Sequence, residues 1–288
     1  YMEKRLYIHT IGCQMNIYDA EKMAAVLWPL GYHLTDSPED ADMVVVNTCG
    51  FLEAAVDDAI VPAAKAFSAS AKAFTTAVGT FCGTTAEESS LLATQKAWRE
   101  LSTRWNALSP YNLGPLDDDV IFPTMIFIES MRQRGRDYTE TVRAKISAAL
   151  ADTAALDPAF FSKLSFTQGG ILALELLVFE ESGGEHRRDA ASVVADFATN
   201  PRKCAYLEGM AEHVESLAAK VDEGWSSAFA GGAAYSTTLK SGLLEDGAAP
   251  VPALLTVLIE HLDYIKKRKL EGILDAQASG HSFDNISS

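Results

Sequence analysis

Hydrophobic positions follow two different patterns along the chain, and the change falls near residue 58. Before it, Lys4–Thr10 and the wholly apolar Met43–Asn47 are typical of strands buried in a parallel sheet. Between them the sequence predicts a helix that Asp19 caps and that ends at about Leu30, followed by an acidic turn over Asp36–Asp42. Residues 1–58 are therefore predicted to form a short β-α-β fragment.

From residue 59 onward no strand pattern remains, and apolar side chains recur at helical spacing in alanine-rich segments. Glycine and proline separate several of these segments. Stacked helices with short connections predict that residues 59–288 form a mainly α domain of helical bundles. The expected helices are Ile60–Val78, Ala86–Leu108, Tyr138–Leu150, Gln168–Phe179, Arg187–Phe197, Cys204–Val221, Ala228–Leu239 and Ala253–Leu270.

Composition and charge narrow the classes of partner. Hydrophobic residues make up 48% of the 288 positions and charged residues 22%, as in a globular protein. The formal net charge of −15 argues against a nucleic-acid partner, because phosphate contacts need clustered Lys and Arg. An acidic protein of this kind suits a small ligand or a metal ion as partner.

Cysteines and apolar runs say little about the compartment. The chain has 4 cysteines, too few for a disulfide scaffold. No apolar stretch reaches the roughly 20 residues of a membrane helix, so no transmembrane segment is expected. Only Leu6–Ile8 is apolar before His9, so no signal peptide is expected in these residues and the chain as given would be cytoplasmic.

An ordered set of motifs in the second pattern resembles the imelysin-like (peptidase M75-like) family. Trp105 precedes a Gly114-Pro115 loop, and Gln168–Phe179 has a glycine, a glutamate and an apolar run ending in Phe. Arg202–Leu207 is similar to the start of the family's next helix, and His281–Asn285 to its closing segment. The resemblance covers about residues 59–288.

This resemblance implies a helical protein of two bundle-like halves, exported to the periplasm or cell envelope and linked to iron regulation or uptake. It also implies a binding cleft whose ligand is small, or is iron or another metal ion. The residues that the resemblance assigns to ligand binding are Glu175, Gly170, Trp105, Gly114, Pro115, Arg202 and Tyr206.

The family's Gly-x-His-x-x-Glu motif, a metal or peptidase site, is incomplete in this chain. The motif aligns with Gly170–Glu175, and Leu172 stands in the histidine position. A His and a Glu three residues apart would share a helix face and ligate one ion, but leucine has no lone pair. Glu175 remains as the one metal ligand of the motif, so we expect a binding protein rather than an enzyme. A metallopeptidase is the alternative.

Glu175 lies inside the apolar run Ile171–Phe179, so its carboxyl group needs a partner or a polar cleft. One interpretation is a structural salt bridge to Arg202 or Arg104. The other is a pocket carboxylate that binds a cation or another ligand.

The first 58 residues resemble a different family, the methylthiotransferases, which are radical S-adenosylmethionine enzymes that modify tRNA or a ribosomal protein. The likeness lies in Lys4–Asn16 with its Gly-Cys-x-x-Asn, and in Asn47-Thr48-Cys49. It implies that Cys13, Cys49 and Cys82 hold a 4Fe-4S iron–sulfur cluster. The sequence lacks the Cys-x-x-x-Cys-x-x-Cys triplet of the radical enzymes, so this alternative function would be incomplete. The chain thus joins two unrelated pieces, as a fusion or a chimera does.

Overall fold

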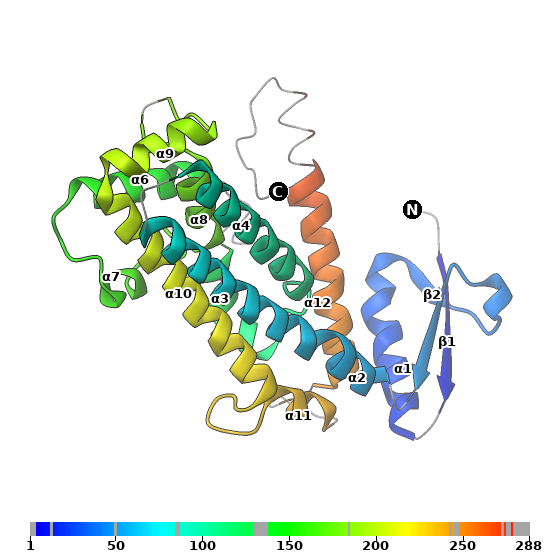
Figure 1. Cartoon of the computed structure of the whole chain (residues 1–288). Helices are drawn as coiled ribbons and strands as arrows, with labels where there is room; N and C mark the ends of the chain where they lie inside the picture. Colours follow the sequence, from blue (N-terminus) through cyan, green and yellow to red (C-terminus); the bar gives the residue numbers. More distant parts are fainter. Residues whose placement is uncertain are drawn as a thin grey trace.

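The computed structural model describes residues 4–11, 14–48, 51–83, 87–129, 138–183, 185–241, 244, 248–271, 274 and 278. A small sheet with one helix precedes a large helical body, as Figure 1 shows. The first elements are β1 (Lys4–Ile11), α1 (Gln14–Leu27), η1 (Trp28–Leu30), β2 (Tyr32–Leu34), η2 (Pro38–Asp40), β3 (Met43–Thr48), α2 (Phe51–Ala54) and η3 (Ala55–Ile60). The helical body continues with α3 (Val61–Gly83), α4 (Glu88–Leu108), η4 (Gly114–Leu116), α5 (Thr124–Ile128), α6 (Thr139–Ala151), α7 (Pro158–Ser162), α8 (Gly170–Phe179), α9 (Ala190–Thr199), α10 (Pro201–Ser226), α11 (Tyr235–Lys240), α12 (Pro250–Tyr264) and η6 (Ile265–Leu270).

The sheet has three parallel strands in the order β2-β1-β3. Leu6 of the central strand pairs with Leu34 on one side and with Met43 on the other, and its side chain is fully buried. Helix α1 lies between the sheet and α12, which joins the fragment to the helical body (Figure 1). The predicted β-α-β fragment is therefore present, with one strand more than expected.

Two details of that prediction are wrong. The helix begins at Gln14, so Asp19 lies inside it rather than at its cap, because no glycine or proline lies between Gln14 and Asp19 to interrupt it. The strand β3 is not buried on both faces: the side chains of Val44 and Val46 are 50% and 49% exposed. A parallel strand is buried throughout where helices cover both faces of its sheet, and α1 covers one face.

The helical body is built around long helices that pack side by side, α3 against both α4 and α10 (Figure 1). Phe67, Phe74 and Phe81 recur every seventh residue along α3 and are fully buried. Side chains at that spacing lie on one face of a helix, so α3 presents an aromatic stripe to its neighbours. The core also includes Val56 of η3, so the helical packing begins upstream of residue 59.

The expected long helices are present, and the differences are in short elements. The five-residue helices α5 and α7 are too short to show a period in sequence. The helix expected over Ala228–Leu239 is reduced to α11, because Ala230 and Gly231 have left-handed φ values of 50° and 78° that interrupt it. None of the described helices is long and apolar enough to cross a membrane.

A disulfide joins Cys82, in the last turn of α3, to Cys204, in the first turn of α10. The two cysteines are 122 residues apart in sequence. The bond therefore links α3 to α10, which are separated in the sequence by α4 to α9.

Candidate functional site

The helix α8 carries the altered motif, and its side chains from Ile171 to Val178 are all buried. Gly170 begins it with φ of 77°, a left-handed conformation that favours glycine. A Cβ atom at this position would lie 2.5 Å from the carbonyl oxygen of Ile128 at the end of α5. The glycine of the motif thus serves close packing of α8 on α5.

Two polar side chains of α4 hold α8 from one side. Trp98 donates its indole Nε1–H to the carbonyl oxygen of Ile171 at 3.2 Å, and Gln95 donates from Nε2 to the carbonyl of Val178 at 2.9 Å. The second bond satisfies a carbonyl in the last turn of α8, where helical partners run out. Gln95 carried no signal in the sequence pattern.

Glu175 is fully buried in the middle of α8. Neither of its carboxyl oxygens has a hydrogen-bond partner among the described residues. Burial raises the pKa of Glu175 to about 7; the nearby charge of Arg188 lowers it, and that of Glu180 raises it. The carboxyl group is therefore largely protonated at mildly acidic pH and ionises near neutrality.

The salt bridges considered for Glu175 are not formed. Arg202 donates instead to backbone carbonyls, from Nε to Ala149 at 2.7 Å and from Nη2 to Ala154. Arg104 pairs with Glu100 at 2.6 Å on the exposed surface of α4. The structural interpretation of Glu175 as half of an ion pair is therefore wrong.

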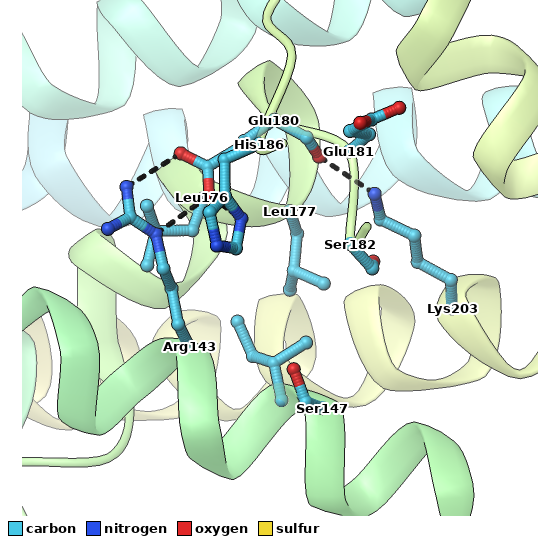
Figure 2. Close-up of a pocket in the computed structure, with 10 residues that line it drawn as sticks. Arg143, Ser147, Leu176, Leu177, Glu180, Glu181, Ser182, His186 and Lys203 are labelled. Carbon is cyan, nitrogen blue, oxygen red and sulfur yellow. Dashed lines mark hydrogen bonds and ion pairs between the residues drawn. The ribbon is translucent and has the colours of Figure 1, made fainter. Parts of the chain in front are cut away.

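A dense charge cluster follows directly after α8, and Figure 2 shows it. The Glu180 side chain is 3% exposed and accepts from Arg143 of α6 at 2.7 and 2.9 Å. Arg188 donates to the same carboxylate at 3.1 Å, and the Nδ1 of His186 lies 3.0 Å from it. Glu180 is thus a buried carboxylate with its charge compensated, in contrast to Glu175.

Lys203 of α10 closes this cluster from the other side (Figure 2). Its ammonium group is buried and donates to Asp196 at 2.6 Å and to the carbonyl oxygen of Glu180 at 2.9 Å. Burial lowers the pKa of Lys203, although the charge of Asp196 opposes this effect. Between these groups lies a cavity of about 20 Å³, enough for a single water molecule.

The other residues assigned to ligand binding lie in separate places. Trp105 donates its Nε1–H to Glu129 at 2.7 Å, beside the same end of α5 that contacts Gly170. Gly114 packs against the ring of Tyr235, where a Cβ atom would lie 2.5 Å away, and Pro115 packs against α10 at Gly224. Among the described residues no hydrogen bond or ion pair links any of these to Glu175.

Tyr206 is buried on α10, and its ring makes edge contacts with Phe160 and Phe161. Its hydroxyl group has no partner among the residues that the structure describes, and burial raises its pKa. Tyr206 and Glu175 are thus both buried side chains whose oxygen atoms have no hydrogen-bond partner in the described parts of the chain. The segment His281–Asn285 lies outside the described residues.

Residues that could hold a metal are sparse. Leu172 is buried and offers no ligand atom, and in the described parts of the chain no three His, Cys, Asp or Glu side chains gather closely enough to bind an ion. The sulfur of Cys82 is bonded to Cys204, which is incompatible with its expected role as a thiolate ligand of an iron–sulfur cluster. Cys13 and Cys49 lie outside the described residues.

Comparisons with known proteins match the chain to two families, and the two matches overlap over residues 60–100. Residues 60–283 match the family described as Imelysin, and residues 5–100 match the "Uncharacterized protein family UPF0004". An imelysin-like protein from Psychrobacter arcticum has a similar structure, with a TM-score of 0.56 at 14% identity over 76% of this chain and 61% of that one. This likeness concerns the fold.

The curated relatives match the N-terminal fragment. The tRNA-2-methylthio-N(6)-dimethylallyladenosine synthase of Maricaulis maris is 54% identical over 54 residues, which are 19% of this chain and 12% of that protein. The enzyme of the same name from Rickettsia conorii is 50% identical over 56 residues, 19% of this chain and 13% of its own length. The chain therefore spans a small part of the relatives it matches.

Proposed function

Because the chain belongs to the Imelysin family, we propose that it is a helical binding protein without peptidase activity whose ligand contacts the carboxyl group of Glu175. One observation carries the proposal: Glu175 is buried in the altered motif, and neither of its oxygens has a partner among the described residues. A buried carboxyl group without a partner costs stability, and such a cost is typical of functional sites.

Peptidase chemistry finds little support around this residue. It would need a metal or a base that activates water, held beside the glutamate. The neighbouring motif position is Leu172, which is buried and apolar. Without such a metal or base, the carboxyl group of Glu175 can form a hydrogen bond or bind a cationic group. These interactions suit ligand binding rather than peptide hydrolysis.

The iron link comes from the family resemblance, and the residues around Glu175 do not fit a resident iron ion. They supply one carboxylate in an apolar helix, whereas iron sites use several nitrogen, oxygen or sulfur ligands. If iron is involved, we infer that it arrives inside a larger ligand such as haem or a chelate. A hydrogen-bond donor carried by that ligand, such as a water molecule or a hydroxyl group, would contact Glu175.

Calorimetric titration with haem, with ferric citrate and with ferrous iron tests this function. We expect haem or ferric citrate to bind, and Glu175→Gln to weaken that binding about tenfold or more, because a charged hydrogen bond is worth about 1.5–3 kcal/mol. The matched control is Glu212→Gln on the exposed face of α10, which should leave binding unchanged. The proposal is contradicted if none of the three ligands binds, or if the Glu175→Gln variant binds them as tightly as the wild-type protein.

The disulfide also bears on where the helical body works. Disulfides persist in oxidising compartments and are rare in the cytosol. The Cys82–Cys204 bond thus supports our proposal that the helical body acts in the cell envelope, as the family resemblance implies. The same bond removes Cys82 from cluster chemistry, so a tRNA-modifying activity is not proposed for this chain.

A further inference from the structure

A second cavity lies on another part of the helical body, between the segment that leads into α5 and the helix α12. Its volume of about 300 Å³ would hold a small organic molecule. Glu175 is not among its walls, so this site is independent of the function proposed above. The cavity is lined by Asn112, Asp117, Val120, Pro123, Met125, Ile126, Val257, Glu260 and Tyr264.

Two carboxylates line this cavity, and both residues are exposed. Asp117 comes from the end of η4 and Glu260 from α12, and neither forms a hydrogen bond or ion pair with any described residue. Burial, followed by the negative charges of Asp118 and Glu260, raises the pKa of Asp117. The two groups thus repel one another, and no Lys, Arg or His is among the described residues that line the cavity.

The neighbouring aspartates show that Asp117 is not part of the loop's own framework. Asp118 accepts from Lys220 at 2.6 Å and from the backbone N–H of Thr124 at 2.7 Å. Asp119 accepts from the backbone N–H groups of Ile121 and Phe122, both at 2.8 Å. Two of three consecutive aspartates therefore hold the loop, and the third is left facing the cavity.

The remaining walls combine apolar surface with one unsatisfied acceptor. Val120 is fully exposed and Val257 of α12 is partly exposed, and both line the cavity. The Oδ1 atom of Asn112 is buried at the wall and accepts no hydrogen bond from a described residue. The cavity thus combines negative charge with exposed apolar surface in one volume.

We propose that this cavity binds a small organic ammonium ion. The ammonium group would lie between the carboxylates of Asp117 and Glu260, where it removes their mutual repulsion. A short hydrocarbon body would cover Val120 and Val257 and so remove apolar surface from water. A transition-metal ion is a poorer occupant, because no third His, Cys, Asp or Glu side chain joins the two carboxylates among the described residues.

Ligand-observed NMR titration of the full chain with pentylammonium tests the proposal, with pentanol and pentanoate as neutral and anionic matches. We expect pentylammonium to bind at least fivefold more tightly than either match, and its binding to weaken as salt is added. Asp117→Asn combined with Glu260→Gln should reduce the affinity about tenfold, since each partly exposed charge pair is worth up to about 1 kcal/mol.

Three further variants complete the experiment. Val257→Phe should fill the cavity and abolish binding of pentylammonium, while Glu212→Gln, outside the cavity, should leave it unchanged. Glu175→Gln should also leave it unchanged, which separates this site from the one proposed above. Equal binding of pentanol, or undiminished binding by the double variant with an unchanged helical circular dichroism spectrum, would overturn the proposal.

Discussion

The carboxyl group of Glu175 leaves water on folding without gaining a partner among the described residues. Its folded-state pKa is about 7, above the ordinary value of 4.5, because burial penalises the charged form. Five residues later, Glu180 is buried just as deeply but has Arg143 and Arg188 as partners. One buried glutamate is thus held in a charge cluster, and the other, which we propose as the ligand contact, has no hydrogen-bond partner among the described residues.

The raised pKa of Glu175 makes stability depend on pH. Between pH 4.5 and 7 the folded protein keeps a proton that the unfolded chain loses, so the free energy of unfolding falls as the pH rises. The difference in pKa corresponds to about 3 kcal/mol from this group. Urea unfolding at pH 4.5 and 7.5 should show the loss in the wild-type protein and a loss smaller by that amount in Glu175→Gln. Equal losses in the wild-type protein and in Glu175→Gln would show that Glu175 does not cause this pH dependence.

The Glu180 cluster should tolerate the loss of a cation poorly. Arg143→Met leaves a buried carboxylate short of its main partner, so we expect a loss of about 3 kcal/mol in unfolding free energy. The matched control is Arg104→Met, which removes an exposed pair with Glu100 and should cost less than about 0.5 kcal/mol. Chemical denaturation of both variants measures the contrast; similar costs would show that Glu180 does not depend on Arg143.

At the residue scale the sequence predicted that Glu175 is special but not which groups surround it. An acidic residue inside an apolar run is visible in one dimension. The partner of Glu180 is 37 residues away on α6, and no local period indicates such a distance. The acidic pair Glu180-Glu181 directly after an apolar helix, with Arg187-Arg188 close behind, was a signal that could have found part of the cluster.

Among the elements, α8 depends on close packing at its first residue. Gly170 combines a left-handed φ with a carbonyl oxygen 2.5 Å from where a Cβ atom would lie. Gly170→Ala should therefore lower the unfolding free energy by about 2 kcal/mol or more. Gly79→Ala, in the middle of α3 with open space around it, should instead raise it by about 0.5–1 kcal/mol. Thermal or urea unfolding of the two variants measures this difference. Changes of the same sign in their unfolding free energies would contradict this account of α8.

The long helices were predictable because each shows several turns of its apolar period. The short elements α5, α7 and β2 were not, because three to five residues do not complete a pattern. The absence of α5 from the prediction mattered for the site, because Gly170 packs on this helix. Trp105 also donates its hydrogen bond to Glu129 at the end of the same helix. Contacts of this kind depend on tertiary packing, which a single sequence does not encode locally.

For the molecule as a whole, the order of the motifs predicted both the helical body and the sheet fragment. It did not predict the disulfide, because four cysteines allow several pairings. Nor did it predict the ammonium cavity, whose two carboxylates come from distant parts of the chain. The sheet fragment keeps one face open, with Val44 and Val46 half exposed, consistent with a short piece of a larger parallel sheet.

The disulfide should contribute to the stability of the whole helical body. The bond joins two cysteines that are 122 residues apart. Closing a loop of that length lowers the entropy of the unfolded chain, which stabilises the folded protein by about 4 kcal/mol or more. Replacing Cys82 and Cys204 together by alanine should lower the unfolding free energy by about that amount under oxidising conditions. Adding a reductant should then destabilise the wild-type protein but not the variant. Full alkylation of Cys82 in the oxidised, folded protein would contradict the bond.

The most direct test of the account is a ¹³C NMR titration of the Glu175 carboxyl carbon in the intact chain, assigned by its loss in Glu175→Gln. The account predicts a midpoint near pH 7, because the group is buried and has no partner among the described residues. A midpoint at or below 4.5 would show a solvated or ion-paired carboxylate and would contradict the claim that Glu175 is held for a ligand.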